Sequence, residues 1–475
     1  MKKMFLKDVS AMRFAFYIFL FILTLNTQSF AKDSSSLIKK LSLKEVASKT
    51  LEYVFTDQVS AADRYYWKGE FRTKIQSTLV PALVGVGKMI TRDDEATGFT
   101  TASVVNQLAQ LYLENPESQN ESPFSKIPKV IALGVKTFDR YKAGETFNFY
   151  PALILKNGIT VRRPIAMTLF PIWHGFTNVP NDADTTSSVL AAQIYNSKIN
   201  RMPFEVRDQS LAEFGKYLDL NRSPMFYNSS EKQKETGAFM TWLFDENDPD
   251  MPRFYFASSK KGERIPFNKN DVDCIVNLNV LKLLALSQES SEGHESACRY
   301  LNNVIERDQS MSCGIYYPNS YNLAFAVAGA SQAGESCIKD NNKQALIKKI
   351  LDGQGADGSW VNADNMWEDK IISTAFALYA LIEFGESTDL SVRFAKAYGL
   401  RYLLSQAKIK NGLIFWKEDN FFTATAIARS LVMWRSKAFT NTIIANVLLK
   451  IHKQSPDLRV GDYVKTGSET SGFSQ

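Results

Sequence analysis

The sequence predicts an all-α protein, an α/α toroid of about six helical hairpins arranged in two concentric rings. Three observations predict this fold. Helical patterns recur along most of the chain, and they alternate between two kinds. In the later part of the chain, one kind begins near residues 271, 321, 370 and 421, which gives a period of about fifty residues. Helices that are apolar nearly all round belong inside a protein, so two concentric layers are expected.

The chain begins with a segment typical of an export signal. Residues 1–31 hold four basic residues, the apolar run Phe14–Leu25 and the small residues Ser29 and Ala31 at the positions that a signal peptidase reads. This apolar run is well short of the roughly 20 residues that cross a bilayer as a helix. We therefore expect a signal peptide at 1–31 and a periplasmic or secreted mature protein with no transmembrane segment.

The mature chain is close to neutral. Without the four basic residues and one acidic residue of the signal segment, the full chain's 56 basic and 50 acidic residues leave a net charge of +3. The basic residues are scattered, which argues against a nucleic-acid partner. Residues 32–455 are predicted to form the toroid domain, and residues 456–475 a disordered tail rich in Gly, Ser and Thr.

The first kind of helix is rich in small and apolar residues, which predicts an inner ring. Its expected members are Thr100–Tyr112, Asp184–Tyr195, Asp271–Leu286, Tyr321–Ala330, Lys370–Phe384 and Phe421–Trp434. The second kind has an apolar stripe and a charged face, which predicts an outer ring. Its expected members are Ser125–Tyr141, Leu211–Leu220, Ala297–Arg307, Lys343–Leu351, Leu390–Gln406 and Thr440–His452.

A shorter motif precedes the later inner helices. Gln354 is followed by Gly358, Ser359 and Trp360, and the frame returns more loosely with other aromatic residues near 237, 314 and 412. A Gln side chain can bond the free backbone groups of a helix end, Gly permits a sharp reversal, and an aromatic ring covers the end. The motif therefore indicates architecture rather than catalysis.

This frame resembles the QW motif of the terpene cyclases, which share the α/α toroid with the protein prenyltransferases. A second segment resembles the acid motif of class II terpene cyclases in its Asp-x-Asp-Thr-Thr variant, and it reads Asp182, Ala183, Asp184, Thr185 and Thr186. The resemblance implies that Asp184 is the protonating acid, tuned by Asp182 and Thr185. The chain departs from the common form of that motif at Thr185, which replaces a third Asp.

The same spacing of two carboxylates recurs in Asp271 and Asp273 ahead of another inner helix. In a ring of parallel inner helices these groups gather at one mouth, where neighbouring carboxylates raise one another's pKa. One protonated carboxyl could then act as an acid on an alkene or a glycosidic oxygen, or the group could hold a divalent cation. The alternative is that each Asp only caps its own helix.

Aromatic residues are frequent around these carboxylates, and ring faces stabilise carbocations as well as sugars. They are Phe147, Phe149, Tyr150, Trp173, Phe176, Trp242, Tyr316, Tyr317, Trp360, Trp367 and Trp416. His174 precedes Asp182 by eight residues and is a further candidate site residue. Asp271, Asp273 and Cys274 do not match the spacing of a prenyltransferase zinc site, so we expect neither a metal nor a cofactor.

Three functions remain open. The first is acid-initiated cyclisation of an isoprenoid or another hydrophobic substrate, with Asp184 as general acid. The second is an exported carbohydrate-active enzyme, a glycoside hydrolase or polysaccharide lyase that uses the carboxylates at the mouth. The third is a non-catalytic binding or scaffold protein. A deep apolar pocket with one buried Asp favours the first, and an open cleft with paired carboxylates favours the second.

The four cysteines allow three pairings. The repeat places Cys274 and Cys313 at the mouth, and Cys298 and Cys337 at the opposite end. An inner helix of about 14 residues is roughly 20 Å long, far more than the distance between the Cα atoms of a disulfide. The sequence therefore predicts the bridges Cys274–Cys313 and Cys298–Cys337.

Overall fold

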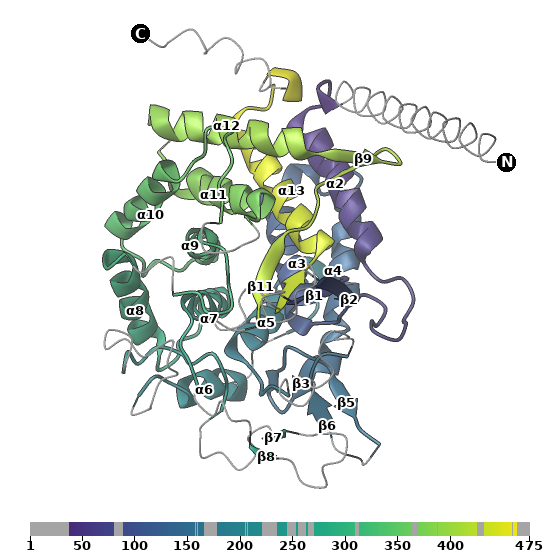
Figure 1. The fold of residues 1–475 in the computed structure, drawn as a ribbon, viewed down its shortest axis with the longest axis vertical. Coiled ribbons are helices and arrows are strands. Elements are labelled where there is room, and N and C mark those ends of the chain that lie inside the picture. The colour runs from purple at the N-terminus through teal and green to yellow at the C-terminus, as the bar shows by residue number, and fades with distance from the viewer. Residues whose placement is uncertain are drawn as a thin grey trace, which may run out of the picture.

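The computed structural model describes most of the chain after the predicted signal segment, and that segment lies outside the described residues. The residues that the structure describes are 38–79, 89–156, 158, 160–165, 178–204, 206, 208–220, 235–244, 253–254, 263–264, 270–308, 313–362, 368–386, 388–424, 432–457 and 459–462. Most of the regular structure is helical and the strands are short (Figure 1). Within this part of the chain no helix is long and apolar enough to cross a membrane.

One set of helices contacts in a closed cycle through the middle of the molecule. Each packs on the next, and the last packs back on the first. In chain order they are α3 (Gly98–Glu114), α5 (Ala183–Asn200), α7 (Cys274–Ser287), α9 (Asn322–Gln332), α11 (Lys370–Phe384) and α13 (Lys437–Gln454). In α11, every residue from Ile372 to Leu381 is buried, as expected for an inner helix.

A second set of helices lies outside this cycle (Figure 1). In chain order they are α2 (Leu43–Asp57), α4 (Ile127–Val135), α6 (Asp208–Lys216), α8 (His294–Glu306), α10 (Asp340–Asp352) and α12 (Leu390–Gln406). Helix α8 shows why they face outward, because it buries Leu301 and Val304 on one side and exposes Glu295 and Arg299 on the other. The predicted helix at 125–141 is divided into η3 (Phe124–Lys126), α4 and η4 (Phe138–Tyr141), with the short η2 (Pro116–Ser118) before them.

The prediction of an inner helix at Phe421–Trp434 is wrong. The segment forms the strands β11 (Asn420–Thr423) and β12 (Val432–Arg435), whose aromatic and β-branched residues favour extended backbone. The inner helix is α13, which we expected to be an outer helix at 440–452. Its Thr and Asn residues gave this segment a polar pattern. However, the side chains of Thr442 and Asn441 are buried, and they donate hydrogen bonds to the carbonyls of Ala438 and Trp416.

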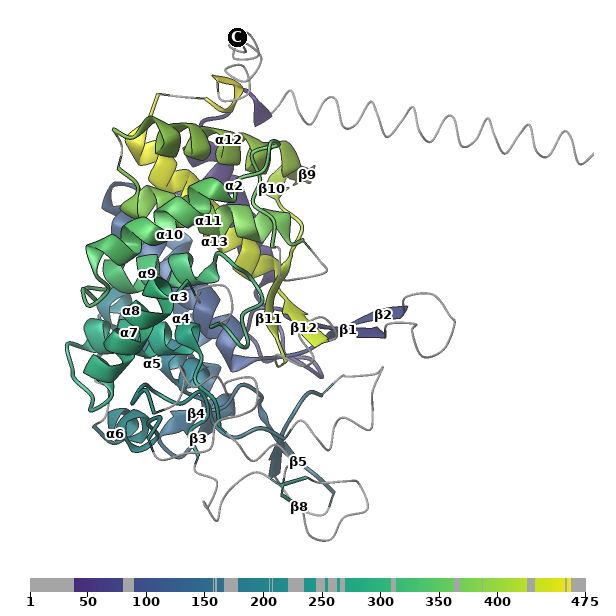
Figure 2. The same ribbon diagram turned by 60° about the vertical axis from the view of Figure 1, so that its left-hand side comes forward.

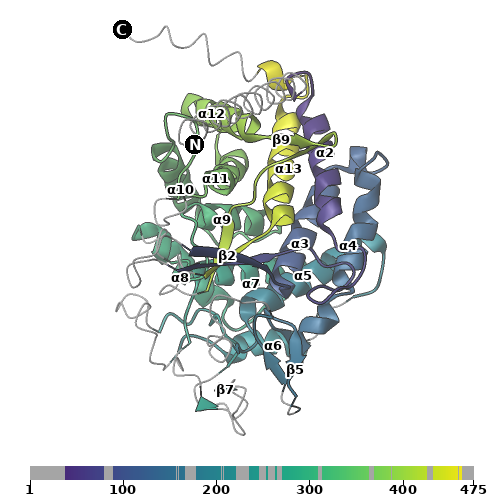
Figure 3. The same cartoon turned by 45° about the vertical axis from the view of Figure 1, so that its right-hand side comes forward.

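The strands β11 and β12 belong to a four-stranded antiparallel sheet that leads into the inner helices. Its other strands are β1 (Lys74–Leu79) and β2 (Met89–Asp94), in the order β11-β12-β1-β2. Strand β12 runs directly into α13, and β2 into α3. Figure 2 shows β1 and β2 projecting from the helical body, and Figure 3 shows β2 in front of the inner helices.

The remaining described strands form four short pairs. They are β3 and β4 (Lys142–Ala143, Thr146–Phe147), β5 and β6 (Ala152–Ile154, Thr160–Arg162), β7 and β8 (Arg253–Phe254, Glu263–Arg264), and β9 and β10 (Lys408–Lys410, Leu413–Phe415).

The Gln-Gly-Trp segment is architectural, as its composition predicts. The Trp360 indole N–H donates to the carbonyl of Ile350 at the end of α10 over 2.7 Å, and Gln354 Nε2 donates to Ala395 O of α12 over 3.0 Å. Gly358 has a φ of +84°, and a Cβ there would lie 2.5 Å from the Tyr398 carbonyl oxygen. Only glycine therefore fits this turn, which ties two outer helices together.

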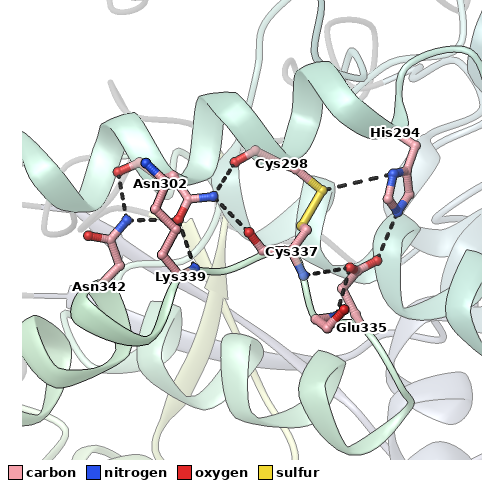
Figure 4. Close-up of a disulfide and its surroundings, with 8 residues drawn as sticks. His294, Cys298, Asn302, Glu335, Cys337, Lys339 and Asn342 are labelled. Carbon is pink, nitrogen blue, oxygen red and sulfur yellow. Dashed lines mark hydrogen bonds and ion pairs between the residues drawn. A yellow bond between two sulfur atoms is a disulfide. The ribbon is translucent and has the colours of Figure 1, made fainter.

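Both predicted disulfides are present. Cys274 and Cys313 have Cα atoms 5.5 Å apart, and Cys298 and Cys337 have Cα atoms 5.7 Å apart. The first bridge lies where α7 begins. The second joins α8 to the segment that follows α9, at the opposite end of the inner helices. Figure 4 shows the second bridge beside Asn302, whose side chain donates to the carbonyls of both cysteines.

The described part of the chain continues past the predicted boundary at 455. Val460 is buried, and its N–H donates to the carbonyl of Leu41 over 3.0 Å. Arg459 pairs with Ser42 just before α2. The beginning of the predicted tail therefore packs beside the first described helix, and residues 463–475 lie outside the described part of the chain.

Candidate active site

Asp182 is the N-cap of α5. Its side chain accepts a hydrogen bond from the Thr185 N–H over 2.5 Å, which satisfies one of the free amides of the first turn. Burial raises the pKa of Asp182 to about 7, although hydrogen bonds from backbone N–H groups oppose this rise. Asp182 thus fixes the direction in which α5 starts.

Asp184 lies two residues later and makes different contacts. Its Oδ1 accepts a hydrogen bond from Asn279 Nδ2 of α7 over 2.6 Å, and its Oδ2 accepts a short one from the Tyr317 hydroxyl. Burial and the neighbouring Asp182 raise the pKa of Asp184 to about 8, against the effect of these two hydrogen bonds. The carboxyl is therefore mostly protonated at neutral pH, and Asn279 and Tyr317 both lie outside its own helix.

Asp273 is the N-cap of α7 and is held entirely by backbone groups. Its Oδ1 accepts from the N–H groups of Ile275 and Val276, and its Oδ2 accepts from those of Ile315 and Tyr316. Burial raises the pKa of Asp273 to about 6. Asp273 thus joins the start of α7 to the loop that carries Tyr316 and Tyr317.

Asp271 is also buried, and its contact lies on the same loop. The Tyr316 hydroxyl donates to Asp271 Oδ2 over 2.7 Å, and the Trp242 indole N–H donates to the Tyr316 oxygen over 2.9 Å. The structure therefore brings Asp182, Asp184, Asp271 and Asp273 to the same end of the inner helices, here called the mouth. It gives each of them a different set of partners.

The remaining predicted site residue, His174, lies outside the described residues. Among those residues, one group has the ligand atoms of a metal site, because atoms of His294, Cys298 and Glu335 lie within 4.8 Å of one another. The sulfur of Cys298 is bonded to Cys337, and His294 Nε2 is 3.0 Å from Glu335 Oε2 (Figure 4). This cluster lies away from the mouth and does not fit a metal ion while the disulfide is formed.

A cavity of about 70 Å³ lies inside the cycle of inner helices. Side chains of α3, α5, α7, α9 and α13 line it, together with Tyr317. Two of the lining residues, Asn279 and Tyr317, are the partners of Asp184. The buried Asp184 carboxyl is therefore in direct contact with two residues that line the cavity.

A cluster of aromatic rings lies beside this cavity, which Phe99 and Tyr317 line, and Phe422 of β11 is at its centre. The Phe422 ring stacks on Phe149 with centroids 5.0 Å apart and on Tyr316 at 5.9 Å, and it meets Tyr317 edge to face at 5.4 Å. Phe99, Phe421 and Trp434 complete this aromatic cluster. Of the aromatic residues that we expected here, Trp360 and Trp416 instead bond outer-helix carbonyls, and Trp173, Phe176 and Trp367 lie outside the described residues.

The sequence matches no protein-family model and no curated protein. Among solved structures, the type II terpene cyclase MstE from Scytonema, in a variant complexed with geranylgeranyl dihydroxybenzoate (substrate), matches with a TM-score of 0.50 and 13% identity, over 89% of this chain and 99% of that chain. Unliganded MstE matches with a TM-score of 0.48, 14% identity and coverages of 87% and 100%. An ent-copalyl diphosphate synthase from Streptomyces platensis matches with a TM-score of 0.39 and 14% identity, over 75% of this chain and 50% of that chain.

The chain has the fold of a type II terpene cyclase. At this level of identity the similarity shows the fold alone. In this cyclase-like fold, sequence reasoning missed Asn279, Phe99 and Phe422. Asn279 could have been noticed as a polar residue within an otherwise apolar helix, whereas Phe422 was hidden by the wrong prediction of a helix.

Proposed function

We propose that this protein is an acid-initiated cyclase for an isoprenoid or a similar polyene, and that its two helical layers form an α/α toroid with Asp184 as the general acid. The observation that carries the proposal is the state of Asp184. A carboxyl with a pKa raised to about 8 is held beside a cavity by Asn279 and Tyr317, while Asp182 caps the helix. Such an acid is protonated and poised at neutral pH.

In the proposed reaction the proton of Asp184 moves to one carbon of an alkene. The two π electrons form the new C–H bond, and the neighbouring carbon becomes a cation that the next double bond attacks, which closes a ring. Loss of a proton from the last cation gives a neutral product with the composition of the substrate. The Asp184 carboxylate left behind is stabilised by the Tyr317 O–H and the Asn279 N–H, and the aromatic cluster faces the cation.

Two further observations support this choice. MstE, which shares the fold, was determined with a geranylgeranyl compound as its substrate. Glycoside hydrolysis needs two carboxyl groups that flank the scissile bond. In the described part of the chain, one carboxylate oxygen of Asp182 and both of Asp273 bond backbone N–H groups, and Tyr316 donates to Asp271. Asp184 instead bonds Asn279 and Tyr317, which line the cavity.

We also propose that the protein acts outside the cytoplasm, in the periplasm or as a secreted protein. The basic and apolar segment at 1–31 has the form of a signal peptide, and both pairs of cysteines are bridged, which oxidising compartments favour. N-terminal sequencing of the exported protein tests this, with Lys32 as the expected first residue.

The test of the cyclase is a search for a cyclic isomer of the substrate, which is one mass unit heavier when the reaction is run in D2O. The mature protein is incubated in D2O with prenyl alcohols and prenyl acids of ten to twenty carbons, and the extracts are analysed by gas chromatography and mass spectrometry. We expect a cyclic isomer that carries one deuterium at carbon, and a loss of at least about 10²-fold in rate for Asp184→Asn. The exposed Asp340→Asn is the control. A full rate in Asp184→Asn, or no isomer from any substrate, would contradict the proposal.

A further inference from the structure

The cavity contains a lysine that the proposed acid chemistry does not use. Lys282 lies three residues after Asn279 on α7, so both project from the same face, with Lys282 about 4.5 Å further along the helix axis. Its side chain reaches α9 at Gly329, where a Cβ would lie 3.9 Å from the Lys282 Nζ. Both residues line the cavity, so the ammonium points into the ring of inner helices.

Nothing in the described part of the chain forms a hydrogen bond or an ion pair with the Lys282 Nζ. Glu114 of α3 acts on it electrostatically, but the carboxylate of Glu114 is already paired with Lys450 over 2.6 Å. Asp184 is mostly protonated at neutral pH because its pKa is about 8, so it supplies little negative charge. Burial lowers the pKa of Lys282 to about 8, which shows the cost of keeping this charge away from water.

The surroundings of Lys282 suit a small polar group. Ser103, Ser188 and Asn322 line the same cavity and add hydroxyl and amide donors. Lys282 is the one cationic side chain among the lining residues, and the cavity volume is about 70 Å³. One ammonium and a few neutral donors match a singly charged carboxylate better than a diphosphate, which carries more charge and bulk.

We infer that Lys282 binds a carboxylate on the substrate, so the substrate is an isoprenoid acid and not a neutral polyene. The isoprenoid part of this statement rests on the function proposed above, whereas the carboxylate part rests on the unpaired ammonium. A bound carboxylate neutralises the Lys282 charge, which would otherwise repel a carbocation formed near Asp184. It also fixes the distance between the anchored end of the substrate and the acid.

The test compares the binding of acids and alcohols of equal length by the full mature chain. The probes are 3-methylbut-2-enoate and geranate, with 3-methylbut-2-en-1-ol and geraniol as the uncharged partners, in isothermal titration calorimetry at pH 7. The variants are Lys282→Met and Lys282→Gln, which remove the charge with a side chain of similar length. Lys198→Met, at an exposed position of α5, is the control.

We expect the wild type and Lys198→Met to bind geranate at least about ten-fold more tightly than geraniol, and both Lys282 variants to lose this preference while they bind geraniol as before. Equal affinities in the wild type, no binding of either acid, or a preference that survives in both Lys282 variants would overturn the inference. Binding does not require turnover. Lys282-dependent binding without any cyclic product would therefore count against the cyclase alone, and cyclic product with Lys282-independent binding would count against the carboxylate alone.

Discussion

The two Asp-x-Asp segments of this chain have the same spacing and opposite arrangements. At the start of α5 the first carboxylate, Asp182, caps the helix, and the second, Asp184, lies in the first turn and bonds side chains of other elements. Before α7 the second carboxylate, Asp273, caps the helix and the first, Asp271, accepts from Tyr316. The helix thus begins two residues earlier relative to the motif in α5. This difference decides which carboxyl is placed beside the cavity, and the motif alone does not.

The largest expected effect comes from removing the carboxylate that caps α7. Asp273→Ala leaves four buried N–H groups without an acceptor, and we expect a loss of about 3–5 kcal/mol in the free energy of unfolding. Asp184→Asn should cost less than about 1 kcal/mol, because an amide is nearly isosteric with a protonated carboxyl and keeps an acceptor for Tyr317 or Asn279. Urea denaturation at pH 7 measures both. Equal losses would mean that the two segments do not differ as described.

A smaller effect concerns the dependence of stability on pH. The pKa of Asp184 is about 8 in the folded state against 3.8 as the ordinary value, so the native protein keeps a proton that the unfolded chain releases. The stability from this group is complete below pH 4 and is lost as the pH rises through 8. Between pH 5 and pH 7 we expect Asp184→Asn to lose less stability than the wild type, by on the order of 2–3 kcal/mol, because each pH unit costs about 1.4 kcal/mol in this range. Parallel curves in urea denaturation would show that Asp184 is not protonated in the native state.

The smallest expected effect is a shift in the pH dependence of the reaction rate. The rate constant kcat/KM should fall above pH 8 as the acid loses its proton. Tyr317→Phe removes a hydrogen bond that lowers the pKa of Asp184, so the fall should move to higher pH. Asp182→Asn keeps a good N-cap but removes a charge that raises the same pKa, so the fall should move to lower pH. Shifts of about half to one pH unit are expected in the pH profile. Movement of both variants in the same direction would refute this electrostatic account.

Much of the fold could be predicted from the sequence, because helix periodicity is a local property. The cysteine pairs could also be predicted, since a disulfide cannot span the length of an inner helix. The strands at 420–435 were missed because Phe421 and Phe422 fit a buried helix as well as a strand, and only pairing with residues 74–77 decides between them.

The site was predicted less completely than the fold. The sequence drew attention to Asp182, Asp184, Asp271 and Asp273, but it could not tell caps from acids. The partners of Asp184 are Asn279 and Tyr317, which lie 95 and 133 residues away along the chain. Contacts of such separation depend on the packing of whole helices, and no periodicity within one segment encodes them. The catalytic roles of these residues remain predictions that the experiments above address.

The packing of α2 on α13 has a consequence for how the molecule assembles. The first described helix lies against the last, and α13 also completes the cycle by contacting α3. These contacts join segments separated by most of the chain, so closing them carries the entropic cost of a very long loop. The intermediate helices can stack as neighbours before that step, but the cycle remains open until α13 is in place. Assembly should therefore finish in a slow, late docking of the C-terminal helix, and a chain shortened before residue 437 should stay open and expose the apolar sides of α2 and α3.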